Sequence, residues 1–265
     1  MEIIAYVASA LIGISLGLIG GGGSILTMPV LVYFFGVSPL LATSYSLFIV
    51  GSTSLAGTIG NFRRGLVNIK TALLFGSASI TTVFLTRKFI IPLVPKTILL
   101  IGNFELTENI LMMVLFAILM VAASVAMIRG GKEEVSPLIK KRKLHVGKLF
   151  YYGISIGLAT GFLGAGGGFL LIPTLVILVG LPMKEAVGTS LFIIALNSLI
   201  GFTGDIGHFD IEWLFLFKIT GVAIAGIFLG GMLNKKIEGD KLKKGFGWFV
   251  LVMGFYILFK EIVLK

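Results

Sequence analysis

The sequence contains no cysteine, and only 13% of its 265 residues are charged. The absence of cysteine excludes disulfide bonds, thiolate metal sites and a cysteine nucleophile. Soluble domains carry about 25% charged residues, so the low charge argues against a water-soluble protein. The sequence also lacks a P-loop, an HExxH motif and an acidic metal-binding cluster, and we therefore expect no metal and no cofactor.

The sequence is rich in apolar residues, which occur in long stretches. Hydrophobic residues make up 57% of the chain, and apolar stretches of about 17 residues or more, typical of membrane-spanning helices, recur along its length. The formal net charge is +10, but the 22 Lys and Arg residues gather in short segments between the apolar runs. Such clusters fix the orientation of a membrane protein. We therefore expect a multi-pass protein of the plasma membrane that contacts the lipid bilayer and does not bind nucleic acid.

The chain contains an internal repeat. A shift of 144 positions aligns "GISLGLIGGGGSILTMPVLVYFFG" (13–36) with "GLATGFLGAGGGFLLIPTLVILVG" (157–180) without a gap. The same shift places "SLFIVGSTSLAGTIG" (46–60) on "SLFIIALNSLIGFTG" (190–204). Roughly two in five positions from 13 to 60 are identical to their counterparts, which indicates a tandem duplication.

We divide the chain into a first transmembrane repeat (1–128), a basic cytoplasmic linker (129–148) and a second transmembrane repeat (149–265). Each repeat holds four apolar segments. They are 3–35, 40–59, 71–94 and 109–128 in the first repeat, and 149–179, 186–203, 213–233 and 245–259 in the second. Glycines interrupt the first segment of each repeat, at 20–23 and at 164–168.

Two topologies compete for these segments. If the interrupted segments cross the bilayer, each repeat has four crossings and the repeats run parallel; if they fold back as re-entrant hairpins, each repeat has three and the repeats are inverted. The re-entrant topology places nearly all the Lys and Arg clusters inside and leaves Arg87 and the acidic turn 204–212 outside, whereas the crossing topology leaves "NKKIEGDKLKK" (234–244) outside. We therefore predict an all-α protein of two inverted repeats, each with one re-entrant segment and three transmembrane helices.

The glycine breaks are candidates for an anion-binding site. Where a half-helix begins after the glycines, its first N–H groups lack partners and carry a partial positive charge, and glycine lets a ligand approach the backbone. Paired breaks of this kind are typical of a substrate site near the midplane of a secondary transporter. The alternative is that the glycines only let helices pack closely. The candidate residues are Gly20, Gly21, Gly22 and Gly23, with Gly164, Gly166, Gly167 and Gly168.

The sequence around the breaks resembles a known family. "GGGGSILTMPVL" and "GAGGGFLLIPTLV", each followed by "ATSYSLFIVGSTSLAG" or "AVGTSLFIIALNSLIG", are similar to the sulfite exporter TauE/SafE family of membrane permeases. The resemblance covers nearly the whole chain and both repeats. It implies secondary transport of small sulfur-containing anions such as sulfite, sulfonates, sulfoacetate or thiosulfate.

Polar side chains within the apolar segments are further candidates for substrate binding. Hydroxyls follow the first break or begin the next segment of each repeat, at Ser24, Thr27, Ser44, Ser46, Thr189 and Ser190. Helix capping and bonding to the backbone are the alternatives for these hydroxyls. Asn197 lies in the middle of a segment, where its amide either contacts the ligand or joins two helices.

Charged side chains complete the candidate site. Lys218 is the only cation that we place within an apolar segment, where it either faces the substrate route or extends to the membrane surface. Asp205, His208 and Asp210 lie in the acidic outer turn. They are candidates for proton coupling because a histidine beside carboxylates titrates near neutral pH, although a solvated loop is the alternative.

These observations predict a secondary transporter of small anions that is coupled to protons or to the membrane potential. A passive anion channel on the same scaffold is the alternative, and a homo-oligomer stays open. A membrane-embedded enzyme is disfavoured, because an intramembrane serine protease needs a histidine at bilayer depth and neither His145 nor His208 lies within an apolar run.

Overall fold

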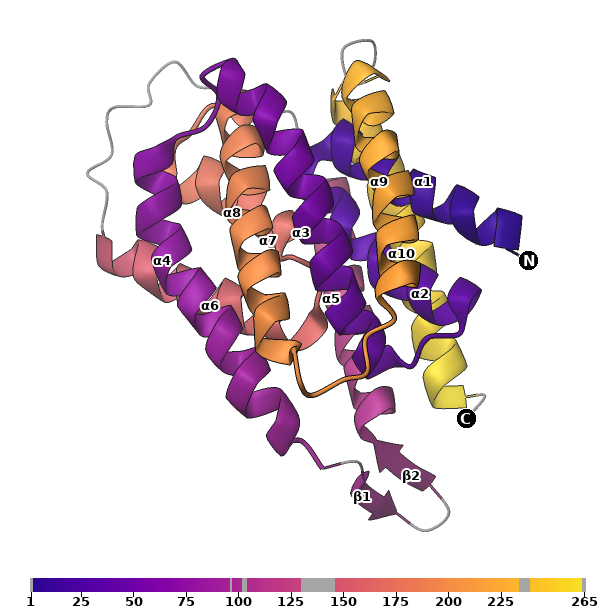
Figure 1. Ribbon diagram of the computed structural model, residues 1–265. Helices are drawn as coiled ribbons and strands as arrows, with labels where there is room; N and C mark the ends of the chain where they lie inside the picture. The colour runs from indigo at the N-terminus through magenta and orange to yellow at the C-terminus, as the bar shows by residue number, and fades with distance from the viewer. Residues whose placement is uncertain (1, 96, 102–103, 130–145, 234–238, 264–265) are drawn as a thin grey trace.

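The computed structural model describes residues 2–95, 97–101, 104–129, 146–233 and 239–263, which form a helical bundle with one two-stranded sheet (Figure 1). Five helical stretches of this described chain are long and apolar enough to cross a membrane. They are α3 (Pro39–Arg63), Ile69–Leu93, α5 (Glu108–Arg129), α8 (Met183–Asp205) and α9 (Trp213–Leu233). The prediction of a helical, multi-pass membrane protein is therefore confirmed.

The stretch Ile69–Leu93 is made of three pieces: α4 (Ile69–Leu85), a π-helical turn η2 (Thr86–Ile90) and a 3₁₀ turn η3 (Ile91–Leu93). β1 (Thr97–Ile101) and β2 (Phe104–Thr107) follow it as an antiparallel hairpin, which the sequence did not predict. α10 (Gly239–Val263) contains the predicted sixth crossing, 245–259, but is not among the five stretches found in the described residues.

The two interrupted segments are each built from shorter pieces. In the first, α1 (Glu2–Ile19) leads through the 3₁₀ helix η1 (Gly20–Leu26) into α2 (Thr27–Phe35). In the second, α6 (Val146–Leu163) is followed by α7 (Gly168–Thr174) and the π-helical turn η4 (Leu175–Val179). The predicted glycine breaks therefore coincide with the points where regular α-helix stops.

Local chemistry explains several other helix boundaries. α2 ends at Gly36, whose φ of +68° is a conformation that glycine adopts without strain. α3 begins with Pro39 in its first turn, where the missing N–H group removes no helical hydrogen bond. α4 begins after Asn68, whose side-chain oxygen accepts a hydrogen bond from the backbone N–H of Thr71 at 3.0 Å.

α3 and α8 pack against each other at the centre of the bundle and run antiparallel (Figure 1). The start of α8 lies beside the end of α3, because Gly188 packs on Leu66. The end of α8 lies beside the start of α3, because Asp205 and Thr43 both contact Arg87. The end of the α3–α8 pair that holds Asp205 is therefore opposite to the end that holds Gly188.

Two further helix pairs each join the first half of the chain to the second. α1 packs on α9, with Gly13 against Ala223, and α6 packs on α4, with Gly157 against Ser79. Gly13 and Gly157 are 144 positions apart, and so are Ser79 and Ala223. The two halves of the chain are thus interlocked and do not form separate lobes.

Each interrupted segment begins and ends in the same neighbourhood. The ring centroids of Tyr6, in α1, and Phe35, the last residue of α2, are 6.3 Å apart. Phe35 also contacts Phe215 near the start of α9, with a centroid distance of 5.1 Å. In the second half, Leu149 of α6 and Leu181, which follows η4, are buried in one apolar cluster. In the first half, the two ends of the interrupted segment therefore lie close together.

Candidate functional site

The two glycine breaks touch each other inside the bundle. A Cβ atom built on Gly21 of η1 would lie 2.6 Å from the Cα atom of Gly168, and one built on Gly168 would overlap the carbonyl oxygen of Gly21. Only glycine fits at either position. Gly21 also packs on Ile194, the middle residue of α8, so the breaks meet at mid-length of the central helix pair.

Positive φ angles explain why several other positions in the breaks are glycine. The values are +72° at Gly20, +66° at Gly164 and Gly166, and +65° at Gly167, which directly precedes α7. L side chains rarely adopt this conformation. Crowding adds to the constraint at Gly166, where a Cβ atom would lie 2.8 Å from Cγ1 of Val50. Gly22 and Gly23 continue η1.

Buried hydroxyls without partners are spread over the helices around the breaks. Eight Ser and Thr hydroxyls are buried and have no hydrogen-bond partner among the described residues: Thr27, Ser44, Ser46, Thr53, Ser54, Thr86, Thr160 and Ser198. Two of them stand at the second break, where Ser198 Oγ lies 3.1 Å from the Cβ position of Gly166 and Thr160 lies against Gly167. An unsatisfied buried hydroxyl costs about 1–3 kcal/mol, so this set is suited to binding a polar ligand or water.

The six hydroxyls predicted from the sequence divide into two groups. Three belong to the set without partners: Thr27, Ser44 and Ser46. The other three are already engaged with the backbone. Ser24 and Ser190 donate to carbonyl oxygens of their own segments at 2.8 and 2.9 Å, and Thr189 accepts from the N–H of Asn68 at 2.9 Å. The second group therefore stabilises local structure.

Asn197 joins two helices. Its Nδ2 donates to Oγ of Ser79 at 2.7 Å, which links α8 to α4. Its Oδ1 is buried without a hydrogen-bond partner in the described chain. One half of the amide therefore holds helices together, and the other half is left to accept a bond.

A buried ion pair lies at one end of the α3–α8 pair. Arg87 of η2 and Asp205, the last residue of α8, are both 0% exposed, and Nη1 lies 3.2 Å from Oδ2. The same Nη1 donates to Oγ1 of Thr43 at 2.9 Å. Ser44 stands beside the Asp205 carboxylate, although no hydrogen bond of ordinary geometry joins them. Burying two charges costs several kcal/mol per ion, and charges within membrane helices are commonly functional.

Sequence reasoning missed Arg87. It counted this residue among the charges outside the membrane and took Lys218 as the only cation within an apolar segment. The statement on Lys218 is wrong, because Arg87 lies fully buried in the apolar stretch Ile69–Leu93. The signal was present, since Arg87 falls inside the predicted apolar segment 71–94. Of the three residues predicted in the acidic turn, Asp205 is buried, whereas His208 and Asp210 are exposed.

Thr43 connects the ion pair to the second glycine break. A Cβ atom built on Gly164 would lie 2.6 Å from the Cα atom of Thr43, whose hydroxyl holds Arg87. The site therefore brings together buried glycine backbone, hydroxyls without partners in the described structure and a guanidinium. All three kinds of group donate hydrogen bonds to oxyanions.

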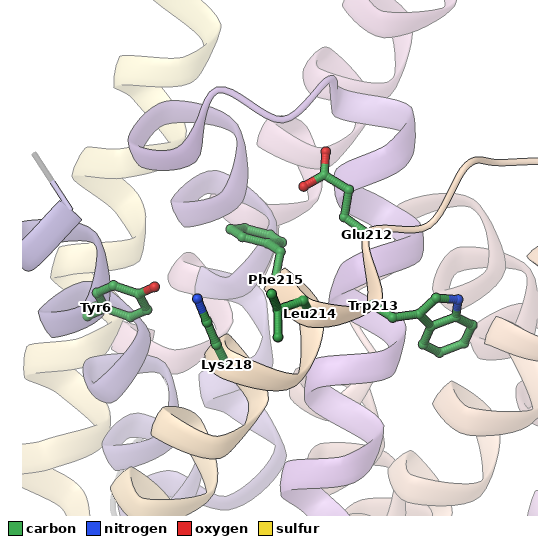
Figure 2. Close-up of a pocket in the computed structure, with 6 residues that line it drawn as sticks. All are labelled: Tyr6, Glu212, Trp213, Leu214, Phe215 and Lys218. Atoms are coloured by element: carbon green, nitrogen blue, oxygen red, sulfur yellow. The ribbon is translucent and has the colours of Figure 1, made fainter.

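Lys218 lies apart from this centre. It is exposed on the second turn of α9 and lines a pocket of about 480 Å³ (Figure 2). The other described residues that line this pocket are Tyr6, Glu212, Trp213, Leu214 and Phe215. Figure 2 shows the Lys218 amino group pointing toward the hydroxyl of Tyr6, on α1. The glycine breaks contribute none of the residues that line the pocket in the described chain.

Comparison with known families covers almost the whole chain. The model of the family described as "Sulfite exporter TauE/SafE" matches residues 5–257. The chain belongs to the sulfite exporter TauE/SafE family. The matched range includes both glycine breaks and the Arg87–Asp205 pair, so the resemblance inferred from the glycine motifs is confirmed.

Curated relatives of this TauE/SafE protein carry a common description. A "Probable membrane transporter protein" of Xylella fastidiosa (strain 9a5c) is 28% identical over 265 residues, which cover 98% of this chain and 95% of the relative. "Probable membrane transporter protein YunE" of Bacillus subtilis (strain 168) is 26% identical over 287 residues, which cover 99% of each chain. No solved structure matches the chain.

These comparisons show that the TauE/SafE protein is a membrane transporter and not an enzyme. Within the residues that the structure describes, no group of three His, Asp or Glu side chains is placed to hold a metal ion. The chemistry to explain is therefore recognition and movement of a ligand.

Proposed function

We propose that this protein is a secondary transporter that binds a small sulfur-containing anion, of the sulfite, sulfonate, sulfoacetate or thiosulfate type, at the meeting point of the two glycine breaks. The observation that carries this proposal is the contact between Gly21 and Gly168 at mid-length of α3 and α8. The description of the family supports the class of substrate.

The groups at this point suit an anion. The helical run that starts at Gly168 directs the positive end of its dipole toward the first break. Ser198 and Thr160 add hydroxyls that have no other partner among the described residues, and both stand at glycines of the second break. In a low-dielectric interior such donors interact more strongly with an anion than they do in water.

Two inverted repeats would give the site its symmetry. The starts of α1 and α6 are 144 positions apart, as are those of α3 and α8, and those of α4 and α9. Corresponding helices of inverted repeats run in opposite directions, and α3 and α8 are antiparallel. We assign the repeats to 1–128 and 149–265, with 129–148 as the linker.

We infer that the two interrupted segments are re-entrant. α2 has nine residues and is about 14 Å long, less than half of a bilayer core of about 30 Å. The contact between Tyr6 and Phe35 supports entry and exit on one face. This topology places the turn that holds His208 outside the plasma membrane and the α3–α4 turn inside.

Cysteine labelling tests the topology. A cysteine introduced at His208 is expected to react with a membrane-impermeant thiol reagent added to intact cells. One introduced at Arg64 is expected to react only after the membrane is opened. Both side chains are exposed, and the native chain contains no cysteine that would react in the background. Labelling of both positions from the same side would contradict the inverted repeats.

Transport by this protein would draw on the proton gradient or the membrane potential, since the sequence has no nucleotide-binding motif. The halves of the bundle would rock about the glycine contact to open the site to each side in turn. A passive anion channel on the same scaffold would need no such movement. It would also never move its anion against an electrochemical gradient.

Uptake into liposomes tests the proposed function. The purified full chain is reconstituted, and uptake of sulfite, thiosulfate, sulfoacetate and taurine is compared with uptake of acetate and succinate. We expect saturable accumulation of at least one sulfur anion above its equilibrium level when a pH or voltage gradient is applied. Accumulation of carboxylates alone would contradict the substrate class, and flux that only follows the gradient would establish the channel.

A further inference from the structure

The guanidinium of Arg87 has an unused edge inside the protein. Its Nη1 serves both Thr43 and Asp205. Its Nε and Nη2 have no hydrogen-bond partner among the described residues, although the side chain is fully buried. The N–H groups of these two nitrogens lie side by side along one edge of the planar group. That edge matches two oxygens of a single oxyanion.

An unfilled edge of this kind needs an explanation. Leaving a buried charged donor without an acceptor costs more free energy than leaving a neutral one. Arg87 would satisfy that need locally if Asp205 bound it through both oxygens, but Oδ1 of Asp205 has no hydrogen-bond partner in the described structure. The ion pair therefore leaves donors on the arginine and an acceptor on the aspartate for other species.

Charge balance links the two free groups. In the structure, the charges of Arg87 and Asp205 cancel. A monovalent oxyanion on Arg87 would leave one net negative charge in a buried site, where an uncompensated charge is expensive. Uptake of one proton by Asp205 restores neutrality, and the free Oδ1 can hold that proton.

The other groups around Asp205 do not supply the missing positive charge. Thr43 and Ser44 of α3 are neutral. Lys88 is exposed, and its amino group lies over the rings of Phe84 and Phe89 at 5.4 and 6.0 Å. Neither approach places this charge beside the buried carboxylate.

The elements that pack on the remaining sides of Asp205 do not supply a positive charge beside its carboxylate either. α6 presents Gly161 to Thr86 of η2, and both are uncharged. The turn that follows α8 carries His208, which is exposed three residues after Asp205 and interacts weakly with its carboxylate. His208 marks where this end of α8 meets water, so a proton has only a short way to travel.

We propose that a small oxyanion binds the Nε–Nη2 edge of Arg87, and that Asp205 takes up one proton from water at this end of the bundle. Anion and proton then travel together. This inference rests on the proposed function, to which it adds the cation and the proton acceptor. Thr43, which holds Nη1 of Arg87, also packs on Gly164, so the ion pair is joined to the second glycine break through this residue.

The test uses the full chain in liposomes and methanesulfonate as the probe. Methanesulfonate stays monovalent across the working pH range, so any pH dependence belongs to the protein. Uptake of labelled methanesulfonate is measured together with internal pH. The variants are Asp205→Asn, the neutral double variant Arg87→Gln with Asp205→Asn, and the control Lys88→Gln, which removes an exposed neighbouring charge.

For the wild type we expect about one proton to enter with each methanesulfonate. Asp205→Asn frees the guanidinium and removes the proton acceptor, so the half-saturation concentration is expected to fall about tenfold, or about 1.4 kcal/mol, without proton entry. The double variant keeps the site neutral and is expected to lose saturable uptake. Lys88→Gln is expected to keep both affinity and coupling.

Two results would overturn the inference while leaving the proposed function intact. One is wild-type half-saturation in the double variant, which would make the pair structural only. The other is continued proton entry with the anion in Asp205→Asn. If the wild type transports no sulfur anion, the proposed function fails by itself.

If the wild type transports no sulfur anion, thermal stabilisation of the purified variants by nitrate and phosphate tests whether Arg87 binds an oxyanion. These probes are suitable because the edge of the guanidinium accepts any oxyanion. Stronger stabilisation of Asp205→Asn and none of the double variant would support the site. Equal responses of all the variants would overturn it.

Discussion

At one end of the antiparallel α3–α8 pair a guanidinium and a carboxylate are buried together, and at the other end the corresponding positions carry no charge. Under the 144-residue shift, Asp205 corresponds to Asn61 and Arg87 corresponds to Gly231. Asn61 is partly buried, and its Nδ2 donates to the carbonyl oxygen of Gly57 in its own helix at 3.1 Å. Neutral local bonds therefore stand where the opposite end has an ion pair.

The difference shows that two stretches of similar sequence can differ in their electrostatics. Each half of the chain contributes one glycine to the central contact. The buried Arg87–Asp205 ion pair, in contrast, lies at one end of the α3–α8 pair and has no counterpart at the corresponding positions of the other end. On the proposed topology the end with the ion pair faces outward. An anion that arrives there meets a buried guanidinium, whereas the corresponding position at the other end is Gly231.

The largest expected effect comes from unpairing the charged end. Arg87→Met leaves the Asp205 carboxylate buried without a cation, and we expect unfolding in detergent to become easier by about 3–5 kcal/mol. Asn61→Ala removes one local hydrogen bond at the other end, for which we expect about 1 kcal/mol. Thermal and denaturant unfolding of the purified proteins measure both.

A double variant serves as the control for that comparison. Arg87→Met combined with Asp205→Leu removes both charges, and we expect it to recover most of the lost stability. If Arg87→Met costs no more than Asn61→Ala, the two ends are equivalent and the comparison fails.

The next effect concerns the centre that both ends share. Gly166 and Gly36 have almost the same φ, +66° and +68°, but a Cβ atom meets Val50 at the first position and nothing within 4 Å at the second. Alanine at either position carries backbone strain of about 1 kcal/mol. At Gly166 we expect a further 1–3 kcal/mol, roughly, from overpacking, together with loss of transport. Equal stability and transport of Gly166→Ala and Gly36→Ala would show that the centre is not tightly packed.

A smaller effect is expected along the central helices. Asn197 corresponds to Thr53 under the same shift, and Asn197 bonds to Ser79 whereas Thr53 has no hydrogen-bond partner among the described residues. Asn197→Leu is expected to cost about 1–3 kcal/mol of unfolding free energy. Thr53→Val removes an unpaired hydroxyl and is expected to be neutral or stabilising. A loss of stability in Thr53→Val would reveal a partner for that hydroxyl.

The smallest effect is expected at Lys218. It is exposed in a surface pocket that lies apart from the glycine contact and from the buried ion pair. For Lys218→Met we expect the half-saturation concentration of uptake to change less than twofold, after correction for the amount of inserted protein. A tenfold increase in the half-saturation concentration would place this pocket on the substrate route. Lys218 would then be a second cation, in addition to Arg87, that contributes to anion binding.

Regular patterns in the sequence predicted much of this architecture. The apolar segments gave the helices, and the glycine runs gave the places where helices stop, because both signals are local. The hairpin β1–β2 was missed since it lies in a short connection between apolar segments. The alignment of the repeats also placed Gly21 and Gly168 in corresponding breaks, although the sequence could not predict that the two backbones touch.

The pairing of Arg87 with Asp205 could not be predicted from local sequence, although the position of Arg87 within an apolar segment could. Arg87 and Asp205 are separated by 118 positions, and each lies near the end of an apolar segment, where a charge ordinarily reaches water. Counting charges by segment therefore assigned both to the outside. Only the packing of η2 against the end of α8 shows that neither side chain reaches the surface.

The contact between Gly21 and Gly168 also limits how the protein can evolve. A clash in a protein core is often relieved when the neighbouring side chain becomes smaller. Here the neighbour is backbone on both sides, and glycine has no side chain left to remove. A substitution at either position consequently has no compensating change at the other, so the two codons are held fixed together and lineages that lose one glycine can regain function only by reversion or by moving a helix.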